Sequence, residues 1–119
     1  MTPTSTTLLP SKFLRHLAFG LLLLSAPASA TKLLIPMDGA QRDHLKAYGI
    51  AYWTLQNEVP IEWLLNYRGG SFLIDHFKTV EQECTIRGVT YQVIADAQAA
   101  AILAEIADPE ANMEVVKLE

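Results

Sequence analysis

Short apolar segments alternate with longer segments of helical periodicity along most of this chain. The apolar segments are four to seven residues long and rich in branched or aromatic side chains, which predicts strands over residues 32–37, 61–67, 89–95 and 113–119. The tetrapeptide Ser-Phe-Leu-Ile at residues 71–74 fits either a further short strand or an extended loop. A turn is expected between residues 68 and 70, where an arginine precedes two glycines.

The first predicted helix covers residues 39–56. Asp38 and Gln41 have the spacing of a capping box at its start. Four large side chains follow one another at steps of three and four, which predicts that they share the face that packs on the core: Leu45, Tyr48, Tyr52 and Leu55. Ile50 and Trp53 widen this predicted face.

Two further helices are predicted. The segment 79–87 has a second capping-box spacing, at Thr79 and Gln82, and ends at Gly88, a residue typical of helix C-termini. Asp96 can cap the last helix, which stops near Asp108-Pro109. Its predicted inner face carries Ala99, Ile102, Leu103 and Ile106.

This order of elements predicts an α/β domain. Strands that alternate with helices are typical of a small three-layer architecture, a mostly parallel sheet with helices on its faces, similar to half of a flavodoxin or amidotransferase-like domain. Three or four such strands with one face uncovered would expose apolar surface. We therefore expect residues 31–119 to be a domain truncated at its C-terminus; a C-terminal edge strand is the alternative.

Residues 1–30 have the order of zones typical of a secretory signal peptide. Lys12 and Arg15 give a basic start, residues 17–26 are apolar, and Pro27-Ala28-Ser29-Ala30 ends in the small residues that signal peptidase accepts. An apolar run of about ten residues is too short for a membrane anchor, which needs roughly 20. We expect cleavage after Ala30 and export to the periplasm or the exterior.

Charge and cysteine content narrow the classes of partner. The leader holds Lys12 and Arg15 of the 9 basic residues and none of the 13 acidic ones, so the net charge of −4 for the whole chain becomes −6 for residues 31–119. An acidic surface argues against nucleic acid and anionic membranes as partners. The single cysteine, Cys84, cannot form an internal disulfide, and we expect it to be a buried structural thiol.

The loops that follow the first two strands hold the candidate binding residues. In open α/β sheets, ligands bind beyond the carboxyl ends of the strands. Two glycines let backbone N–H groups approach an anion, an arginine can bind it in a fork, and a serine can donate. We therefore predict a cradle for a small anionic metabolite, made by Asp38, Arg42, Asn66, Arg68, Gly69, Gly70 and Ser71. A plain turn is the alternative, and Asp38 fits a helix cap better than an acid or base.

Other chemistry has little support in the sequence. His44 and His76 do not stand at a metal-ligand spacing from another histidine, cysteine or carboxylate, so we expect no metal, and His44 should be solvated on a helix surface. No dinucleotide-binding motif or nucleophile elbow is present, so we expect no cofactor.

Three segments carry a resemblance to a known family. They are KLLIPMD-x-x-Q-x-x-HLKAYGIAYW (32–53), WLLNYRGGSFL (63–73) and DAQAAAILAEIADPEANMEVVKLE (96–119). They resemble the N-terminal region of exported bacterial proteins labelled asparagine synthetase B-like. Because members of that group are several times longer, the resemblance implies that this chain is an N-terminal fragment.

The family label implies a glutamine-hydrolysing asparagine synthase. Such an enzyme uses an N-terminal cysteine as nucleophile and an S-G-G-x-D-S loop that binds pyrophosphate. Here the expected mature N-terminus is Thr31, Cys84 is internal, and residues 68–72 lack the leading serine and the aspartate of that loop. The synthase motifs are therefore absent from this chain.

Three hypotheses about function stay open on the sequence. The chain is a noncatalytic exported α/β domain of an asparagine synthetase B-like protein that binds a small molecule or assembles with the rest of a longer polypeptide. Alternatively, it is part of an amidotransferase or asparagine synthetase-type enzyme whose catalytic residues lie beyond Glu119. As a third possibility, it is a complete small periplasmic protein that forms a homodimer through its open sheet.

Overall fold

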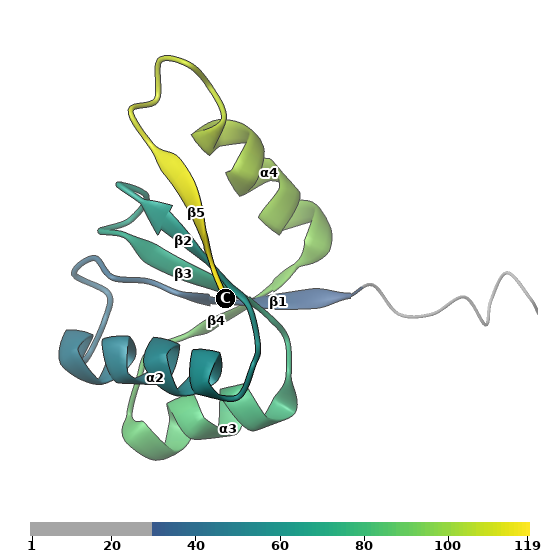
Figure 1. Cartoon of the computed structure of the whole chain (residues 1–119). Coiled ribbons are helices and arrows are strands. Elements are labelled where there is room, and N and C mark those ends of the chain that lie inside the picture. The colour runs from purple at the N-terminus through teal and green to yellow at the C-terminus, as the bar shows by residue number, and fades with distance from the viewer. Residues whose placement is uncertain (1–29) are drawn as a thin grey trace, which may run out of the picture.

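The computed structural model describes residues 30–119, which form five strands and three helices (Figure 1). The predicted signal peptide, residues 1–30, lies outside the described residues except for Ala30. The elements in chain order are β1 (Thr31–Ile35), α2 (His44–Gln56), β2 (Ile61–Leu65), β3 (Ser71–Asp75), α3 (Lys78–Arg87), β4 (Gln92–Ala95), α4 (Asp96–Ile106) and β5 (Glu114–Leu118). None of these helices has the length and apolar content to cross a bilayer.

The sheet is antiparallel throughout, so the prediction of a mostly parallel, flavodoxin-like sheet is wrong. Its order is β4-β1-β3-β2-β5, and every neighbouring pair of strands is antiparallel. Residues 71–74, which fitted either a strand or a loop in the sequence, belong to strand β3 (Ser71–Asp75). This strand makes the sheet antiparallel. It lies between β1 and β2 and pairs antiparallel with both.

Alternating strands and helices do not distinguish the two topologies. The crossover through α2 joins β1 to β2, and the crossover through α3 joins β3 to β4; each skips one place in the sheet, and an antiparallel strand fills that place. The first six elements therefore have the connectivity of the split βαβ, ferredoxin-like arrangement. Helix α4 and strand β5 are added to it, with β5 on the outer edge of β2.

Helices cover both faces of the sheet, which makes three layers. Figure 1 shows α2 and α3 on one side of the sheet and α4 on the other. Consecutive strand residues point to opposite faces, so Leu33 packs in the core under α2 and α3 while Leu34 packs under α4. The inner strands β1 and β3 are therefore apolar on both sides over Leu33–Ile35 and Phe72–Ile74, as in a parallel sheet.

Charged side chains occupy the part of the second face that α4 leaves free. Lys32 on β1 forms an ion pair with Asp75 on β3, with 2.6 Å between Nζ and Oδ1. On the neighbouring pair of strands, Glu62 of β2 stands directly opposite Lys117 of β5. These residues line a shallow recess. The expectation of a large uncovered apolar sheet face is therefore not met in residues 30–119.

Helix α2 presents a face that matches the predicted one only in part. Ala47, Ile50, Ala51 and Thr54 are buried against the sheet. Of the six side chains expected inside, Ile50 is buried and Trp53 and Leu55 are partly buried, but Leu45, Tyr48 and Tyr52 are exposed. The helix turns Ala47 and Ala51 inward because alanines let its backbone approach the sheet closely.

The helix ends differ from the predictions in detail. Helix α2 begins at His44, and its N-cap is Asp43, whose carboxylate accepts a hydrogen bond from Lys46 N at 3.0 Å. Neither Phe77 before α3 nor Ala95 before α4 provides a side-chain cap, so Thr79 and Asp96 are not capping residues. Gly88 does end α3, in the left-handed conformation with φ 70°, as predicted. The inward face of α4 is also as predicted.

Candidate functional site

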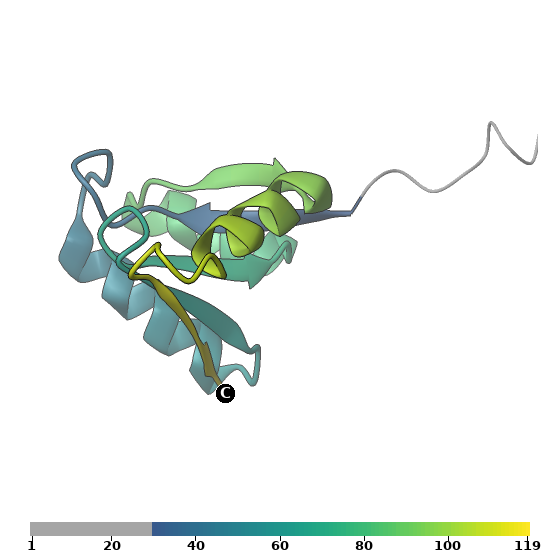
Figure 2. The same ribbon diagram turned by 90° about the horizontal axis from the view of Figure 1, so that it is seen from above.

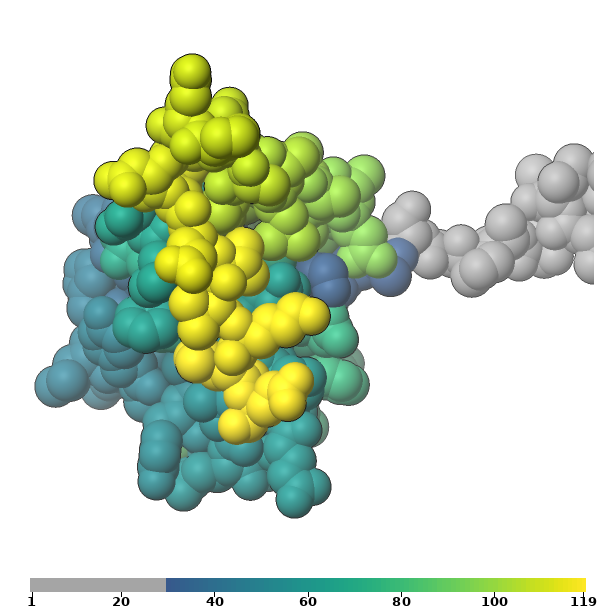
Figure 3. Space-filling view, turned by 45° about the horizontal axis from the view of Figure 1, so that its top comes forward, coloured from purple at the N-terminus to yellow at the C-terminus, as the bar shows by residue number. Residues whose placement is uncertain are grey.

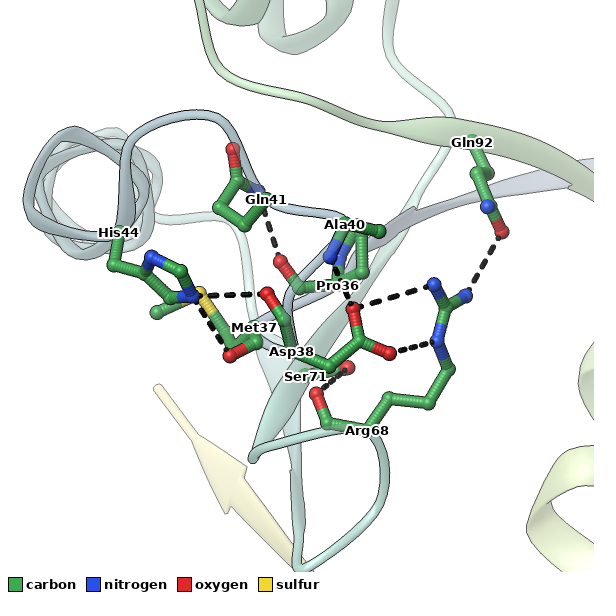
Figure 4. Close-up of polar contacts among 9 residues, drawn as sticks. All are labelled: Pro36, Met37, Asp38, Ala40, Gln41, His44, Arg68, Ser71 and Gln92. Carbon is green, nitrogen blue, oxygen red and sulfur yellow. Dashed lines mark hydrogen bonds and ion pairs between the residues drawn. The ribbon is translucent and has the colours of Figure 1, made fainter.

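Asp38 and Arg68 form an ion pair between two loops that are 30 residues apart in the sequence. Asp38 lies in the loop between β1 and α2, and Arg68 lies in the turn between β2 and β3. The guanidinium donates to the carboxylate from Nε at 2.7 Å and from Nη2 at 3.4 Å (Figure 4). Its Nη1 reaches Gln92 Oε1 on β4 at 3.3 Å. Arg68 therefore ties three segments together at one end of the sheet.

Gly69, the residue after Arg68, allows backbone to pack closely against backbone, whereas the neighbour of a β-carbon on Gly70 would be the Trp63 side chain. A β-carbon on Gly69 would stand 2.4 Å from the carbonyl oxygen of Met37, and its φ of 79° is left-handed. In the same place Met37 N donates to Arg68 O at 3.1 Å. Ser71 is buried and donates from its hydroxyl to Arg68 O at 3.1 Å. These contacts fix the β2–β3 turn on the β1–α2 loop.

The charges of this site are largely compensated within it. The hydrogen bond from Arg68, followed by one from the backbone N–H of Ala40, lowers the pKa of Asp38 below its ordinary value. A carboxylate stays ionised down to a lower pH when such donors surround it. An anionic ligand would have to displace Asp38 from Arg68 before it could use the guanidinium.

The structure brings five of the seven predicted cradle residues together: Asp38, Arg68, Gly69, Gly70 and Ser71. Arg42 is elsewhere; its exposed side chain lines a recess near Cys84 and Thr90. Asn66 also points away, because its amide donates to Asn112 O at 3.0 Å in the segment before β5.

Gln41 and His44 hold the β1–α2 loop in ways that local sequence did not indicate. The buried amide of Gln41 donates to Pro36 O at 2.8 Å and to Thr90 O at 2.9 Å, and it accepts from Thr90 N at 2.8 Å. Gln41 is thus a bridge to the α3–β4 loop and not part of a capping box. His44 is exposed on the helix surface, as predicted, but its ring also bonds through Nε2 to the carbonyl oxygens of Met37 and Asp38 at 3.0 and 2.9 Å.

A second polar cluster, missed on the sequence, lies at the other end of β1. His76 bonds through Nδ1 to the Thr31 hydroxyl and through Nε2 to Glu81 at 2.7 Å. The hydroxyl of Tyr91 donates to the same carboxylate at 3.2 Å. The His76 contact is the main cause of a lowered pKa for Glu81. The only sign of this cluster in the sequence is Glu81, which lies in the first turn of the helix that follows His76.

Cys84 is a buried structural thiol, as predicted. It lies in the core between α3 and the sheet and has no exposed surface. Burial is the main cause that raises its pKa to about 11, so the thiol stays protonated at neutral pH. Such a cysteine is unsuited to nucleophilic catalysis.

Residues 30–119 contain no group of three or more histidine, cysteine or acidic side chains placed to hold a metal ion. Comparisons with protein-family models, with curated proteins and with solved structures found no match for this chain.

Proposed function

We propose that residues 31–119 are a noncatalytic assembly domain of an exported protein of the asparagine synthetase B-like group, and that this domain binds a protein partner through helix α2. The observation that carries this proposal is an apolar stripe on the outer side of α2, made by Leu45, Tyr48 and Tyr52, which we call the α2 stripe. These side chains are 81%, 48% and 65% exposed.

The α2 stripe lies mostly outside the core. Its members stand at spacings of three and four, so they lie on one side of the helix, while other residues of α2 face the sheet. Single exposed apolar residues are common on protein surfaces, whereas contiguous ones are typical of interaction sites. Figure 3 shows α2, in blue, at the surface beside the yellow β5 edge and away from α4.

Tyr48 is held in place before any partner binds. Its ring packs edge-on against Phe72 of β3, with 5.9 Å between ring centroids and 81° between the planes. Phe72 in turn stacks on Trp63 of β2 at 5.9 Å. An aromatic side chain that is already ordered loses less conformational entropy on binding, and tyrosine is a frequent hot-spot residue of protein interfaces.

The assembly role has more support than the binding of an anionic metabolite. Of the two arginines predicted to bind the metabolite, Arg68 already has its N–H groups directed at Asp38 and Gln92, and Arg42 lines a separate recess. The α2 stripe, by contrast, keeps Leu45 and Tyr52 largely exposed and is tied to the core only through the Tyr48–Phe72 contact.

Site-specific photo-crosslinking in the producing cells tests the proposal. A benzophenone amino acid replaces Tyr52 in the whole chain, and the adducts are identified by mass spectrometry. We expect one discrete protein adduct, and we expect it to disappear when Leu45→Glu is added, because a charge in the stripe must be desolvated on binding.

Ile86 on α3 provides the matched control. It is 76% exposed but lies on another helix, outside the stripe. The same crosslinker at position 86 should give no adduct. Equal adducts from positions 52 and 86, or none from either, would contradict the assembly role.

Export is tested separately by N-terminal sequencing of the protein recovered outside the cytoplasm. We expect the first residue to be Thr31. A protein that retains residues 1–30, or that remains in the cytoplasm, would contradict the export proposal without touching the α2 stripe.

A further inference from the structure

Thr31, His76 and Glu81 form a chain of hydrogen bonds at the start of β1. The antiparallel register of β1 and β3 pairs Lys32 with Asp75, and the next residues in that register are Thr31 and His76. The Thr31 hydroxyl bonds to His76 Nδ1, and His76 Nε2 bonds to Glu81 Oε2 at 2.7 Å. A hydroxyl, a histidine that contacts it and a carboxylate that orients the histidine are the parts of an activated nucleophile.

The two contacts of the His76 ring set the direction in which a proton can move. An ionised carboxylate can only accept hydrogen bonds, so in the neutral ring the proton is on Nε2 and is donated to Glu81. Nδ1 then has the free lone pair and can accept the hydroxyl proton of Thr31. The hydroxyl of Tyr91 donates to the other oxygen of Glu81 at 3.2 Å and helps to hold the carboxylate in place.

A backbone donor lies on the carbonyl group that precedes this hydroxyl in the chain. Asp96 N, in the first residue of α4, donates to Ala30 O at 3.0 Å, and this oxygen belongs to the peptide bond between Ala30 and Thr31. The N-terminus of a helix stabilises negative charge. The same N–H is therefore placed to stabilise the oxyanion that forms when a nucleophile attacks the Ala30 carbonyl. Ala30 is exposed and borders an open recess, so water can reach the bond.

We infer that the folded domain cuts its own Ala30–Thr31 peptide bond. The Thr31 hydroxyl oxygen attacks the Ala30 carbonyl carbon, and His76 takes the hydroxyl proton. The C–N bond then breaks as His76 gives that proton to the Thr31 nitrogen, which leaves Ala30 joined to the Thr31 side chain as an ester. Water hydrolyses the ester to the carboxylate of Ala30, a proton and the restored hydroxyl of Thr31, whose amine is now free.

This inference goes beyond the assembly role and is independent of it. The step occurs once in each molecule, so the product is still a noncatalytic domain. His76 and Asp96 reach the Ala30–Thr31 bond only when β1 has paired with β3 and β4, so the cleavage follows folding. A signal peptidase acting at the same bond needs neither of these groups. The domain therefore separates from residues 1–30 by itself once it has folded.

Cell-free synthesis of the whole chain in mild detergent, without membranes or signal peptidase, tests the inference. Mass spectrometry should find residues 1–30 and 31–119 as separate products, and no cleavage in concentrated urea. Hydroxylamine should capture the ester as a hydroxamate at Ala30. Thr31→Val keeps the shape of the side chain without the hydroxyl and should stay uncut, whereas Thr31→Ser should be cut. Thr79→Val, at an exposed threonine of α3, should be cut at the rate of the unmodified chain.

Two substitutions test the base and its orientation. His76→Ala should slow the cleavage by about 100-fold or more, and added imidazole should restore part of the rate because it replaces the missing base. Glu81→Gln should slow it by about 10-fold, and Glu81→Asp, which keeps a charged acceptor for the histidine, should recover part of that loss. A role of these residues in the fold alone predicts neither recovery.

Asp96→Pro tests the oxyanion donor. Proline removes the backbone N–H but suits the first position of a helix, and Ala95 before it already has the extended conformation that proline requires. We expect Asp96→Pro to be cut about 100-fold more slowly than Asp96→Ala, which loses the same carboxylate and keeps the N–H.

Three results would overturn the inference: an unmodified chain that is folded by circular dichroism and stays uncut, cleavage that persists in Thr31→Val, or equal rates in Asp96→Pro and Asp96→Ala. The second of these would identify a contaminating protease. None of them touches the assembly role, because the crosslink at position 52 is read on the domain whether or not residues 1–30 are attached.

Discussion

Gly69 is the residue on which the join between the β1–α2 loop and the β2–β3 turn depends most. A methyl group there would collide with the Met37 carbonyl, and the left-handed φ is unfavourable for alanine. We expect Gly69→Ala to lower the free energy of unfolding by about 2–4 kcal/mol, from backbone strain and overpacking together. Urea denaturation measures this change.

Gly39→Ala is the control for this substitution. A β-carbon on Gly39 has no neighbour within 4 Å, so its effect should stay within about 0.5 kcal/mol. Equal effects at positions 39 and 69 would show that the close approach to Met37 does not matter.

Glu81 makes stability depend on pH in the acidic range. Its folded-state pKa lies below the ordinary value of 4.5, chiefly because of the His76 hydrogen bond. The stability that this carboxylate contributes is therefore fully present above about pH 4.5 and is lost as the pH falls through the lowered pKa. We expect the urea midpoint to fall below pH 4.5, and to fall less steeply in Glu81→Gln.

Glu105→Gln on α4 is the matched control, because the exposed Glu105 carboxylate forms no ion pair within residues 30–119. It should keep the pH profile of the unmodified protein. A Glu81→Gln profile with an unchanged slope would contradict the role assigned to the His76 contact.

At the residue scale, the chemical state of a side chain could be predicted from the sequence, whereas the residues that it contacts could not. The buried thiol of Cys84 was predicted because a single cysteine cannot form an internal disulfide and no base stands near it in the sequence. The ion pair between Asp38 and Arg68 joins positions 30 residues apart, and only the fold brings them together. Arg68 was expected to face a ligand because its carboxylate partner could not be identified from spacing.

Helix α2 offers the clearest prediction at the scale of elements. Ile50 is buried on the inner side of α2, whereas Leu45 on the same helix is 81% exposed. We expect Ile50→Ala to lower the free energy of unfolding by about 2–4 kcal/mol, through lost burial and a cavity. Leu45→Glu should change it by less than about 0.5 kcal/mol. Chemical denaturation compares the two; the reverse order would place the core on the other side of the helix.

The existence of most elements was predictable because each has a strong local signal. The helical period in residues 96–106 predicted α4 correctly. Gly88 predicted the end of α3. The face of α2 could not be chosen, because small and large residues both recur at helical spacing. Tertiary packing decides between them, and here it favours the residues that allow close approach.

At the scale of the whole molecule, α4 and β5 complete the second layer. Removing residues 96–119 would uncover the apolar face formed by Leu34, Leu64, Leu73 and Ile94. We expect such a chain to lose its cooperative thermal transition and to bind a hydrophobic dye. Removing β5 alone, residues 114–119, leaves α4 on that face and should give a cooperative transition at a lower temperature. Dye binding by both truncated chains to the same extent would contradict the role of α4.

The topology could not be predicted from the order of elements, because it depends on which strands pair. A strand of five residues, β3, converts an apparent parallel sheet into an antiparallel one by lying between β1 and β2. Residues 71–74 fit a strand and an extended loop equally well. The three-layer arrangement was nevertheless expected, because strands that are apolar on both sides require cover on both faces.

The place of β1 in the sheet governs the order in which the chain can fold as it is made. The first strand to emerge is an interior one, as Figure 2 shows, and its partners end at Asp75 and Ala95. Its apolar run Leu33-Leu34-Ile35 therefore leaves the ribosome, or the export channel, long before either partner exists. Contacts this distant in sequence slow folding, and an unpaired apolar strand is prone to aggregate in the meantime. Folding of this domain must wait until about four-fifths of the chain has been delivered, so until then its first strand is a segment for a chaperone to hold.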